Sequence, residues 1–144
     1  MNTGFLIDTN VLSELMRENP APQVLAWFAS QNANLMQTSA ITHAEILAGI
    51  ALLPAGKRRE AMAQAASQIF EEDFSGRCFD FGGKAIAHYA MVRAQRQSAG
   101  RPIDAADAQI AAIALATQLT LVTRNTKDFD GIDGLQILNP WLHH

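Results

Sequence analysis

Four acidic residues of this 144-residue sequence stand where a carboxylate could do chemistry. Asp8 follows an apolar run, Glu45 and Asp107 lie in apolar segments with helical periodicity, and Asp128 lies in a loop rich in oxygen donors. Carboxylates brought together repel one another, and a divalent cation between them relieves that repulsion. Hard cations such as Mg2+ and Mn2+ prefer oxygen ligands of this kind. A bound cation can activate a water molecule and hold the oxygens of a phosphodiester during in-line attack.

Of the four acids, Asp8 is expected to have the highest free-energy cost of burial. The apolar residues Phe5–Ile7 run straight into it, and a carboxylate at the tip of a buried strand costs free energy unless something pairs with it. Thr9 and Asn10 follow directly, and a new apolar rhythm begins at Val11. We therefore expect Thr9 and Asn10 to open a helix and to support Asp8.

Glu45 has a structural interpretation as well as a functional one. The segment THAE from Thr42 to Glu45 matches the capping box S/T-x-x-E, in which the glutamate satisfies a backbone donor at a helix start. Capping and a role in a site both stay open on the spacing alone. Helical periodicity places Glu45 on a stripe that we expect to face inward, shared with Ile41, Ala48, Gly49 and Leu52.

Asp104 and Asp107 lie three residues apart on one helix face, where two carboxylates repel each other. Acids are also favoured in the first turn of a helix by its dipole. We expect Asp104 to be the N-cap and Asp107 to be directed at the sheet. Asn125 and Asp128 follow a predicted strand, and either could join a site at its end; a solvated loop is the simpler interpretation of each.

The periodicity predicts short strands that alternate with helices. The expected strands are Phe5–Ile7, Leu35–Thr38, Cys78–Phe81, Thr120–Thr123 and Gly134–Leu138. The expected helices are Thr9–Met16, Pro22–Ser30, Thr42–Leu53, Arg58–Phe70, Lys84–Ser98 and Ala105–Thr117. This alternation favours an α/β fold with a central, mostly parallel sheet covered on both faces, in a single domain over residues 1–144. Functional residues of such sheets gather beyond the carboxyl ends of the strands, where the acids are expected.

Composition bounds the class of protein. Hydrophobic residues make up 49% and charged residues 17% of the chain, which is typical of a globular protein. The formal net charge of -3 gives no global basic character, although local basic patches stay possible. The single cysteine excludes an internal disulfide, and neither a signal peptide nor a membrane-spanning run is expected, which favours the cytoplasm. The sequence has no zinc-type Cys/His spacing, and Gly82-Gly83 lacks the phosphate-loop and dinucleotide motifs.

Four motifs together resemble the PIN-domain ribonucleases. They occur in the expected order over nearly the whole chain and read LIDTNVLSEL, SAITHAEILAGI, DAQIAAIALA and LVTRNTKDF. The likeness is greatest to the VapC toxins of type II toxin–antitoxin systems and their FitB-like subgroup, to which the closing NPW at Asn139–Trp141 is also similar. The resemblance implies an α/β/α sandwich whose acidic cluster binds Mg2+ or Mn2+ and supports hydrolysis of RNA phosphodiesters.

The resemblance also implies roles for individual residues. The expected catalytic residues are Asp8, Glu45, Asp107 and Asp128, of which Asp8, Glu45 and Asp107 would bind the metal. The expected supporting residues are Thr9, Asn10, Asp104, Thr123 and Asn125. Many relatives have an aspartate where this chain has Asn125. The fourth role therefore passes to Asp128, acts through water, or is lost.

The implied partners are an RNA substrate, a VapB-like antitoxin that blocks the acidic pocket, a second copy of the chain, and operator DNA reached only through the antitoxin. An alternative function is a PIN-like protein with weakened catalysis, which acts mainly in a DNA-bound regulatory complex with its antitoxin. Other polar residues are interpreted structurally. His43 is expected to be structural, and Trp27 and Phe28 are expected to pack in the core or at a subunit contact. The cations Lys57–Arg59, Arg93, Arg96 and Arg101 are expected to be mostly solvated surface charges, with contact to an RNA backbone or an acidic partner as the alternative.

Overall fold

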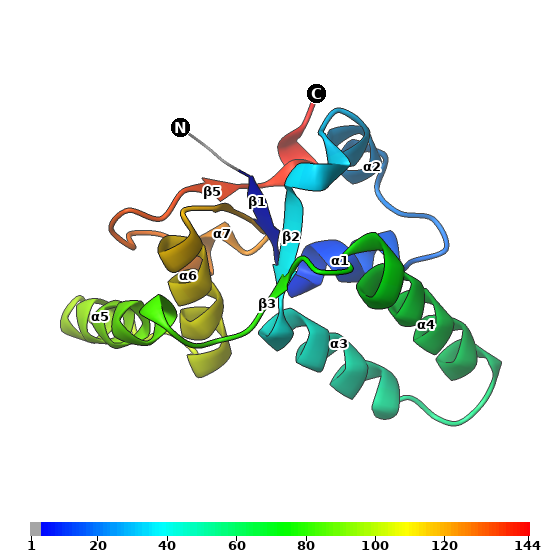
Figure 1. The fold of residues 1–144 in the computed structure, drawn as a ribbon, viewed down its shortest axis with the longest axis horizontal. Helices are drawn as coiled ribbons and strands as arrows, with labels where there is room; N and C mark the ends of the chain where they lie inside the picture. The colour runs from blue at the N-terminus through cyan, green and yellow to red at the C-terminus, as the bar shows by residue number, and fades with distance from the viewer. Residues whose placement is uncertain (1–3) are drawn as a thin grey trace.

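Five short parallel strands form the central sheet of the computed structural model, which describes residues 4–144 (Figure 1). The strands are β1 (Phe5–Ile7), β2 (Met36–Ser39), β3 (Cys78–Phe79), β4 (Thr120–Val122) and β5 (Ile137–Leu138). Their order in the sheet is β3-β2-β1-β4-β5, and each neighbouring pair is parallel. Residues 1–3, which belong to the expected single domain over residues 1–144, lie outside the described residues.

The first strand of the chain is the central strand of the sheet. Leu6 pairs with Gln37 of β2 on one side and with Leu121 of β4 on the other. Leu6 and Ile7 are fully buried, on opposite faces of the sheet. A central parallel strand is covered on both faces, which explains the unbroken apolar run before Asp8. The carboxyl end of β1 therefore lies between those of β2 and β4.

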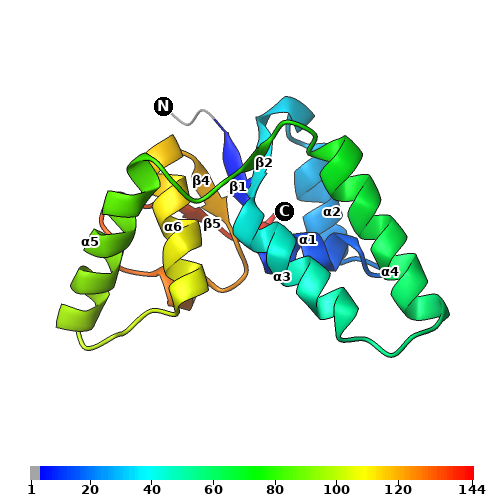
Figure 2. The ribbon, with the colours of Figure 1, turned by 60° about the horizontal axis from the view of Figure 1, so that its bottom comes forward.

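Helices cover both faces of this sheet (Figure 2). On one face lie α1 (Thr9–Leu15), α2 (Pro22–Ala29), α3 (Ala40–Ala51) and α4 (Lys57–Ser67), and on the other α5 (Lys84–Ser98) and α6 (Ala105–Thr117). Ile7 belongs to the core under the first group and Leu6 to the core under the second. The expected three-layer α/β/α architecture is confirmed. No helix of the described residues is long and apolar enough to span a membrane.

Several element boundaries differ from the sequence-based expectation. The helix expected from Arg58 to Phe70 is α-helical only to Ser67 and continues as a π-helical segment, η2 (Gln68–Asp73). The strand expected from Gly134 begins at Ile137, because Gly134 has a left-handed backbone with φ of 81°. The strand expected to reach Phe81 ends at Phe79. Three short helical elements were not expected: η1 (Ala33–Leu35), α7 (Thr126–Phe129) and η3 (Pro140–Leu142).

Candidate active site

Asp8 is held at the carboxyl end of β1 by three hydrogen bonds to its carboxylate. Its Oδ1 accepts from the Thr9 backbone N–H at 2.8 Å, as the N-cap of α1. Its Oδ2 accepts from Asn10 Nδ2 at 2.9 Å and from Thr123 Oγ1 at 2.7 Å. The side chain is buried, and burial raises its pKa against the opposing effect of these hydrogen bonds. Asp8 is thus fixed in orientation and lacks a counter-charge.

Asn10 and Thr123 join three elements around Asp8. Thr123, fully buried just after β4, also accepts from Asn10 Nδ2 at 3.1 Å and from the Asn125 backbone N–H at 3.1 Å. Asn10 Oδ1 accepts from the Arg124 backbone N–H at 2.9 Å. Thr9, Asn10 and Thr123 therefore all contact Asp8 through hydrogen bonds, and their supporting role in the site stays a prediction.

Glu45 reaches the same place from α3, and its carboxylate does not cap that helix. Thr9 Oγ1 donates to Glu45 Oε1 at 2.6 Å. The capping-box interpretation of Thr42 and Glu45 is wrong, because α3 begins two residues earlier: Ser39 is the N-cap and its Oγ accepts from the Thr42 N–H at 3.1 Å. Hydroxyl capping by Ser39 leaves the Glu45 carboxylate free for another role.

Apart from Ile41, which is half-buried against the core, the stripe of α3 that carries Glu45 faces outward, which corrects the expectation that it faces inward. Glu45, Ala48 and Gly49 are exposed, and Leu52 is 86% exposed. The buried stripe is instead Thr42, Ile46 and Ile50. Alanine and glycine carry no strong burial signal, so the periodicity of this segment fits either stripe. Solvent access at Glu45 follows from the outward orientation.

Asp107 has a strongly raised pKa. It lies half-buried in the first turn of α6, and its pKa is raised to about 7. Burial is the main cause, followed by the negative charges of Asp8, Asp104, Asp128 and Glu45 in that order. The electrostatic coupling shows that the structure brings all of these acids into one region. Asp104 occupies the N-cap position as expected, although its side chain makes no capping hydrogen bond.

Asn125 and Asp128, the two residues expected to compete for the fourth site position, lie in the segment after β4. Asn125 precedes α7 and is exposed, with its backbone N–H bonded to Thr123. Asp128 is exposed within α7, and its charge contributes to the raised pKa of Asp107. Asp128 therefore supplies negative charge to the cluster, while Asn125 adjoins it through its backbone.

Arg96 is a site-supporting residue that sequence reasoning missed. It was expected to be a solvated surface charge, yet only 6% of it is exposed. Its Nε donates to the Arg101 carbonyl at 2.8 Å and its Nη1 to the Asp128 carbonyl at 2.8 Å. Arg101, exposed as expected, donates from Nη2 to the Lys127 carbonyl at 3.1 Å. These bonds join the segment that leads to Asp104 with the segment that carries Asp128.

The remaining interpretations agree with the structure. The His43 ring stacks on Phe70 with 4.0 Å between ring centroids, away from any catalytic arrangement. Trp27 is buried and makes edge contacts with Phe5 and Phe28 at 5.0 Å each. The cationic residues 57–59 are exposed at the start of α4. None of these residues joins the acidic cluster.

The acidic cluster has a donor set suited to a hard divalent cation. Within residues 4–144, no lysine or arginine forms an ion pair with Asp8, Glu45, Asp107 or Asp128. Burial raises the pKa of both Asp8 and Asp107, and the neighbouring carboxylates add to the rise in each. In that range no three His, Cys, Asp or Glu side chains are arranged to hold one ion. Mg2+ commonly binds through one or two carboxylates and keeps several waters, so a closed protein cage is not required.

Fold and site together define an α/β/α protein with an acidic site at the carboxyl ends of parallel strands. The family model of the PIN domain matches residues 5–135. The chain belongs to the PIN-domain family.

Individual relatives match the chain over almost its whole length. The VapC ribonuclease Y4jK of Sinorhizobium fredii is 40% identical over 136 residues, which cover 94% of this chain and 96% of that protein. Toxin FitB of Neisseria gonorrhoeae is 39% identical over 136 residues, which cover 94% and 97%. The solved structure of FitAB bound to an IR36 DNA fragment matches with a TM-score of 0.88 at 38% identity, over 97% of this chain and 98% of that chain.

Proposed function

We propose that this protein is a metal-dependent endoribonuclease, the toxin of a VapBC-type toxin–antitoxin module in the cytoplasm. The observation that carries the proposal is the convergence of Asp8, Glu45 and Asp107 without an ion-pair partner, two of them with raised pKa values. Family membership and relatives named VapC ribonuclease and Toxin FitB support the same activity.

The metal would be held by Asp8 and Asp107, and Glu45 would contact it through a bound water molecule. When bound, Mg2+ or Mn2+ would supply charge stabilisation for a phosphodiester and an activated water molecule. Asp8 is presented by a rigid strand and oriented by Thr9, Asn10 and Thr123, so it binds without rearranging. Asp107, with a pKa of about 7, loses its proton when a cation is bound beside it.

The other acids would act at the edge of the site. Glu45 is exposed and its Oε1 accepts from Thr9 Oγ1, so its carboxylate is placed to orient or deprotonate a water molecule. Asp128 would take the fourth acidic position in place of Asn125 and add negative charge at the end of β4. Arg96 and Thr123 are positioning residues, because they act through Asp128 and Asp8.

The proposal includes the partners that such a module requires. The relative FitAB is solved bound to DNA, which supports an antitoxin partner that contacts operator DNA for this chain too. An antitoxin arginine would satisfy the uncompensated carboxylates by charge-assisted hydrogen bonds and so exclude the cation. We include a homodimer in the proposal on family grounds alone.

Cleavage of transfer RNA and ribosomal RNA fragments tests the proposal. Wild type is expected to cut with added Mg2+ or Mn2+ and to stop with EDTA, and Asp8→Asn and Glu45→Gln are expected to lose about 100-fold or more in rate. Glu60→Gln, an exposed acid in the first turn of α4, is the matched control and is expected to cut normally. Equal cleavage by wild type and Asp8→Asn in a clean preparation contradicts the proposal.

A second function rests on Asn125, which removes one acid of the family pattern. In that case the chain acts as a binding protein within the DNA-bound complex. Calorimetric titration with Mn2+ separates the two functions. Metal binding that is abolished by Glu45→Gln favours the nuclease, and no binding by wild type favours the binding protein.

A further inference from the structure

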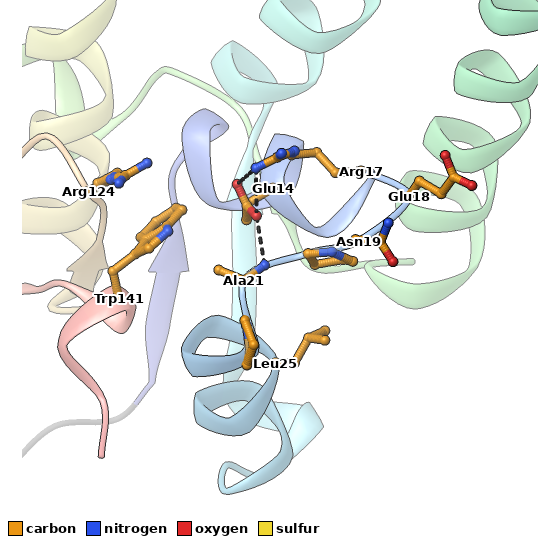
Figure 3. A pocket seen from close by; sticks show the side chains of 10 residues that line it. Glu14, Arg17, Glu18, Asn19, Ala21, Leu25, Arg124 and Trp141 are labelled. Atoms are coloured by element: carbon orange, nitrogen blue, oxygen red, sulfur yellow. Dashed lines mark hydrogen bonds and ion pairs between the residues drawn. The ribbon is translucent and has the colours of Figure 1, made fainter.

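A pocket of about 630 Å³ lies beside the end of α1 (Figure 3). Its lining comes from the end of α1, the following loop, the start of α2, the segment after β4, and η3. In Figure 3, Arg124 and Trp141 lie together on one side, with Glu14, Ala21 and Leu25 across from them. Asn10 connects this pocket to the acids, because it accepts from the Arg124 backbone N–H at 2.9 Å and donates to Asp8 at 2.9 Å.

Arg124 is presented as an anion-binding group. Its guanidinium lies over the Trp141 ring with 4.7 Å to the ring centroid. The guanidinium forms no hydrogen bond with any of residues 4–144, so its N–H groups are free to donate. Stacking on an indole fixes the plane of an arginine side chain without using its donors. Arg124, which directly follows Thr123, is therefore an exposed cation whose orientation is fixed by Trp141.

The two acids of the pocket do not oppose an anion equally. Glu14 is buried, and both of its oxygens are occupied: Oε1 and Oε2 accept from Arg17 Nη1 at 3.2 Å, and Oε2 also accepts from the Ala21 N–H at 2.8 Å. Burial raises the pKa of Glu14, but these hydrogen bonds and the charges of Arg17 and Arg124 together outweigh burial and lower it. Glu14 therefore stays ionised and paired. Arg17 is itself 65% exposed. Glu18 lies on the lining as well.

The walls between these charges are apolar or aromatic. Pro20, Pro22 and Leu25 line the pocket together with Trp141, and Leu25 is 46% exposed. Proteins that bind single-stranded nucleic acid combine an aromatic stacking surface with arginines that follow the backbone. The pocket has both parts, and Asn10 links it to Asp8 through its hydrogen bonds to the Arg124 backbone and to the Asp8 carboxylate.

We propose that this pocket binds the nucleotide next to the cleaved phosphodiester of a single-stranded RNA segment. Arg124 binds the adjacent phosphate, and the base packs against Trp141 and the proline walls. The inference rests on the proposed function, since it takes RNA as the substrate. An RNA strand whose phosphodiester lies at the acids must continue past them, and this pocket would bind the next nucleotide. An acidic peptide is the other occupant that two arginines would attract, and the test includes it.

Binding of a short fluorescein-labelled single-stranded RNA to Asp8→Asn protein, which does not cleave, tests the pocket directly. Arg124→Ala in that background is expected to weaken binding about tenfold and to reduce the slope of log K against log salt by about 0.7. The matched control is Arg93→Ala, since Arg93 is also exposed and lies over an aromatic ring, Tyr89, at 5.7 Å. Arg93→Ala is expected to change neither quantity, and Arg124→Lys to restore the slope but not the full affinity.

Tryptophan fluorescence gives the second measurement. RNA is expected to quench the emission of Asp8→Asn protein, and Trp141→Leu is expected to remove this quenching because the other tryptophan, Trp27, is buried. If RNA binds equally to the Arg124→Ala and Arg93→Ala variants, the subsite is wrong and the proposed function stands. If no RNA binds, both are wrong. If a polyglutamate peptide quenches Trp141 and RNA does not, the pocket is a protein-docking site and the inference is overturned.

Discussion

Thr123 Oγ1 donates a hydrogen bond to Asp8 Oδ2 at 2.7 Å, although 115 positions separate the two residues. The bond joins the end of β4 to the end of β1, and Thr123 is fully buried. The same oxygen accepts from Asn10 and from the Asn125 backbone. The Thr123 hydroxyl therefore sets the orientation of Asp8, and it also fixes the backbone at Asn125, in the segment that leads to Asp128.

Replacement of Thr123 by valine keeps the shape of the side chain and removes this hydroxyl. Asp8, Asn10 and the Asn125 N–H each lose a partner, so the free energy of unfolding is expected to fall by about 1–3 kcal/mol. Mn2+ affinity, measured by calorimetry, is expected to fall by about tenfold because Asp8 is no longer oriented. Thr120→Val is the control, since Thr120 lies at the start of β4, the strand that ends just before Thr123, and its Oγ1 bonds to Gln136 instead. Unchanged Mn2+ affinity in Thr123→Val would mean that Asp8 does not need this support.

The raised pKa of Asp107 makes stability depend on pH. Between an ordinary value of 3.8 and about 7 the folded state holds a proton that the unfolded state has lost. Metal-free protein should therefore lose stability as pH rises through this window, because ionising Asp107 costs free energy only in the folded state. Asp107→Asn is expected to flatten this decline and to be more stable than wild type at pH 8. Urea unfolding at pH 5 and pH 8 in EDTA measures the effect, with Asp133→Asn, an exposed acid, as control. Parallel declines in wild type and Asp107→Asn would contradict it.

Loss of the Arg96 side chain is expected to destabilise the protein by about 2–4 kcal/mol. Arg96→Leu removes a buried side chain and leaves the backbone carbonyls of Arg101 and Asp128 without their donors. Hydrogen exchange is expected to rise selectively in residues 126–130, because that segment is released. Arg93→Ala on the same helix is exposed and is expected to stay within about 0.5 kcal/mol of wild type. Uniform exchange across α5, α6 and α7 in Arg96→Leu would show that the residue supports the fold without positioning this segment.

Divalent metal is expected to stabilise wild type and not Asp8→Asn. Binding at 100 times Kd adds about 2.7 kcal/mol, which raises Tm by roughly 5–10 °C for a chain of this size. In EDTA the order reverses, because Asp8→Asn removes a buried carboxylate that lacks a counter-charge. Thermal scans with MnCl2 and with EDTA measure both effects, and Glu60→Gln is expected to behave as wild type in each. An equal rise in Tm for Asp8→Asn would place the metal elsewhere.

The parts of the fold that follow from local pattern were predictable from the sequence. The FLI run before Asp8 marked a buried strand, and Thr9 and Asn10 opened a helix as expected. The α3 stripe was not predictable, because alanine and glycine at positions 48 and 49 carry no burial signal and Ser39 replaces Thr42 as the cap. The burial of Arg96 was hidden because its acceptors are backbone carbonyls, which leave no trace in the pattern of side chains. The pairing of Thr123 with Asp8 depends on the strand order, which no local spacing encodes.

The central position of β1 has a consequence for the order of events during protein synthesis. Asp8 is the first of the acids to be synthesised. The strand β4, which neighbours β1, and the hydroxyl of Thr123 are made only when most of the chain has been translated. Until then the first acid has neither its orienting partner nor Asp107 beside it. A nascent chain therefore carries no assembled acidic site. The site can form only when translation is nearly finished, after Thr123 has been made.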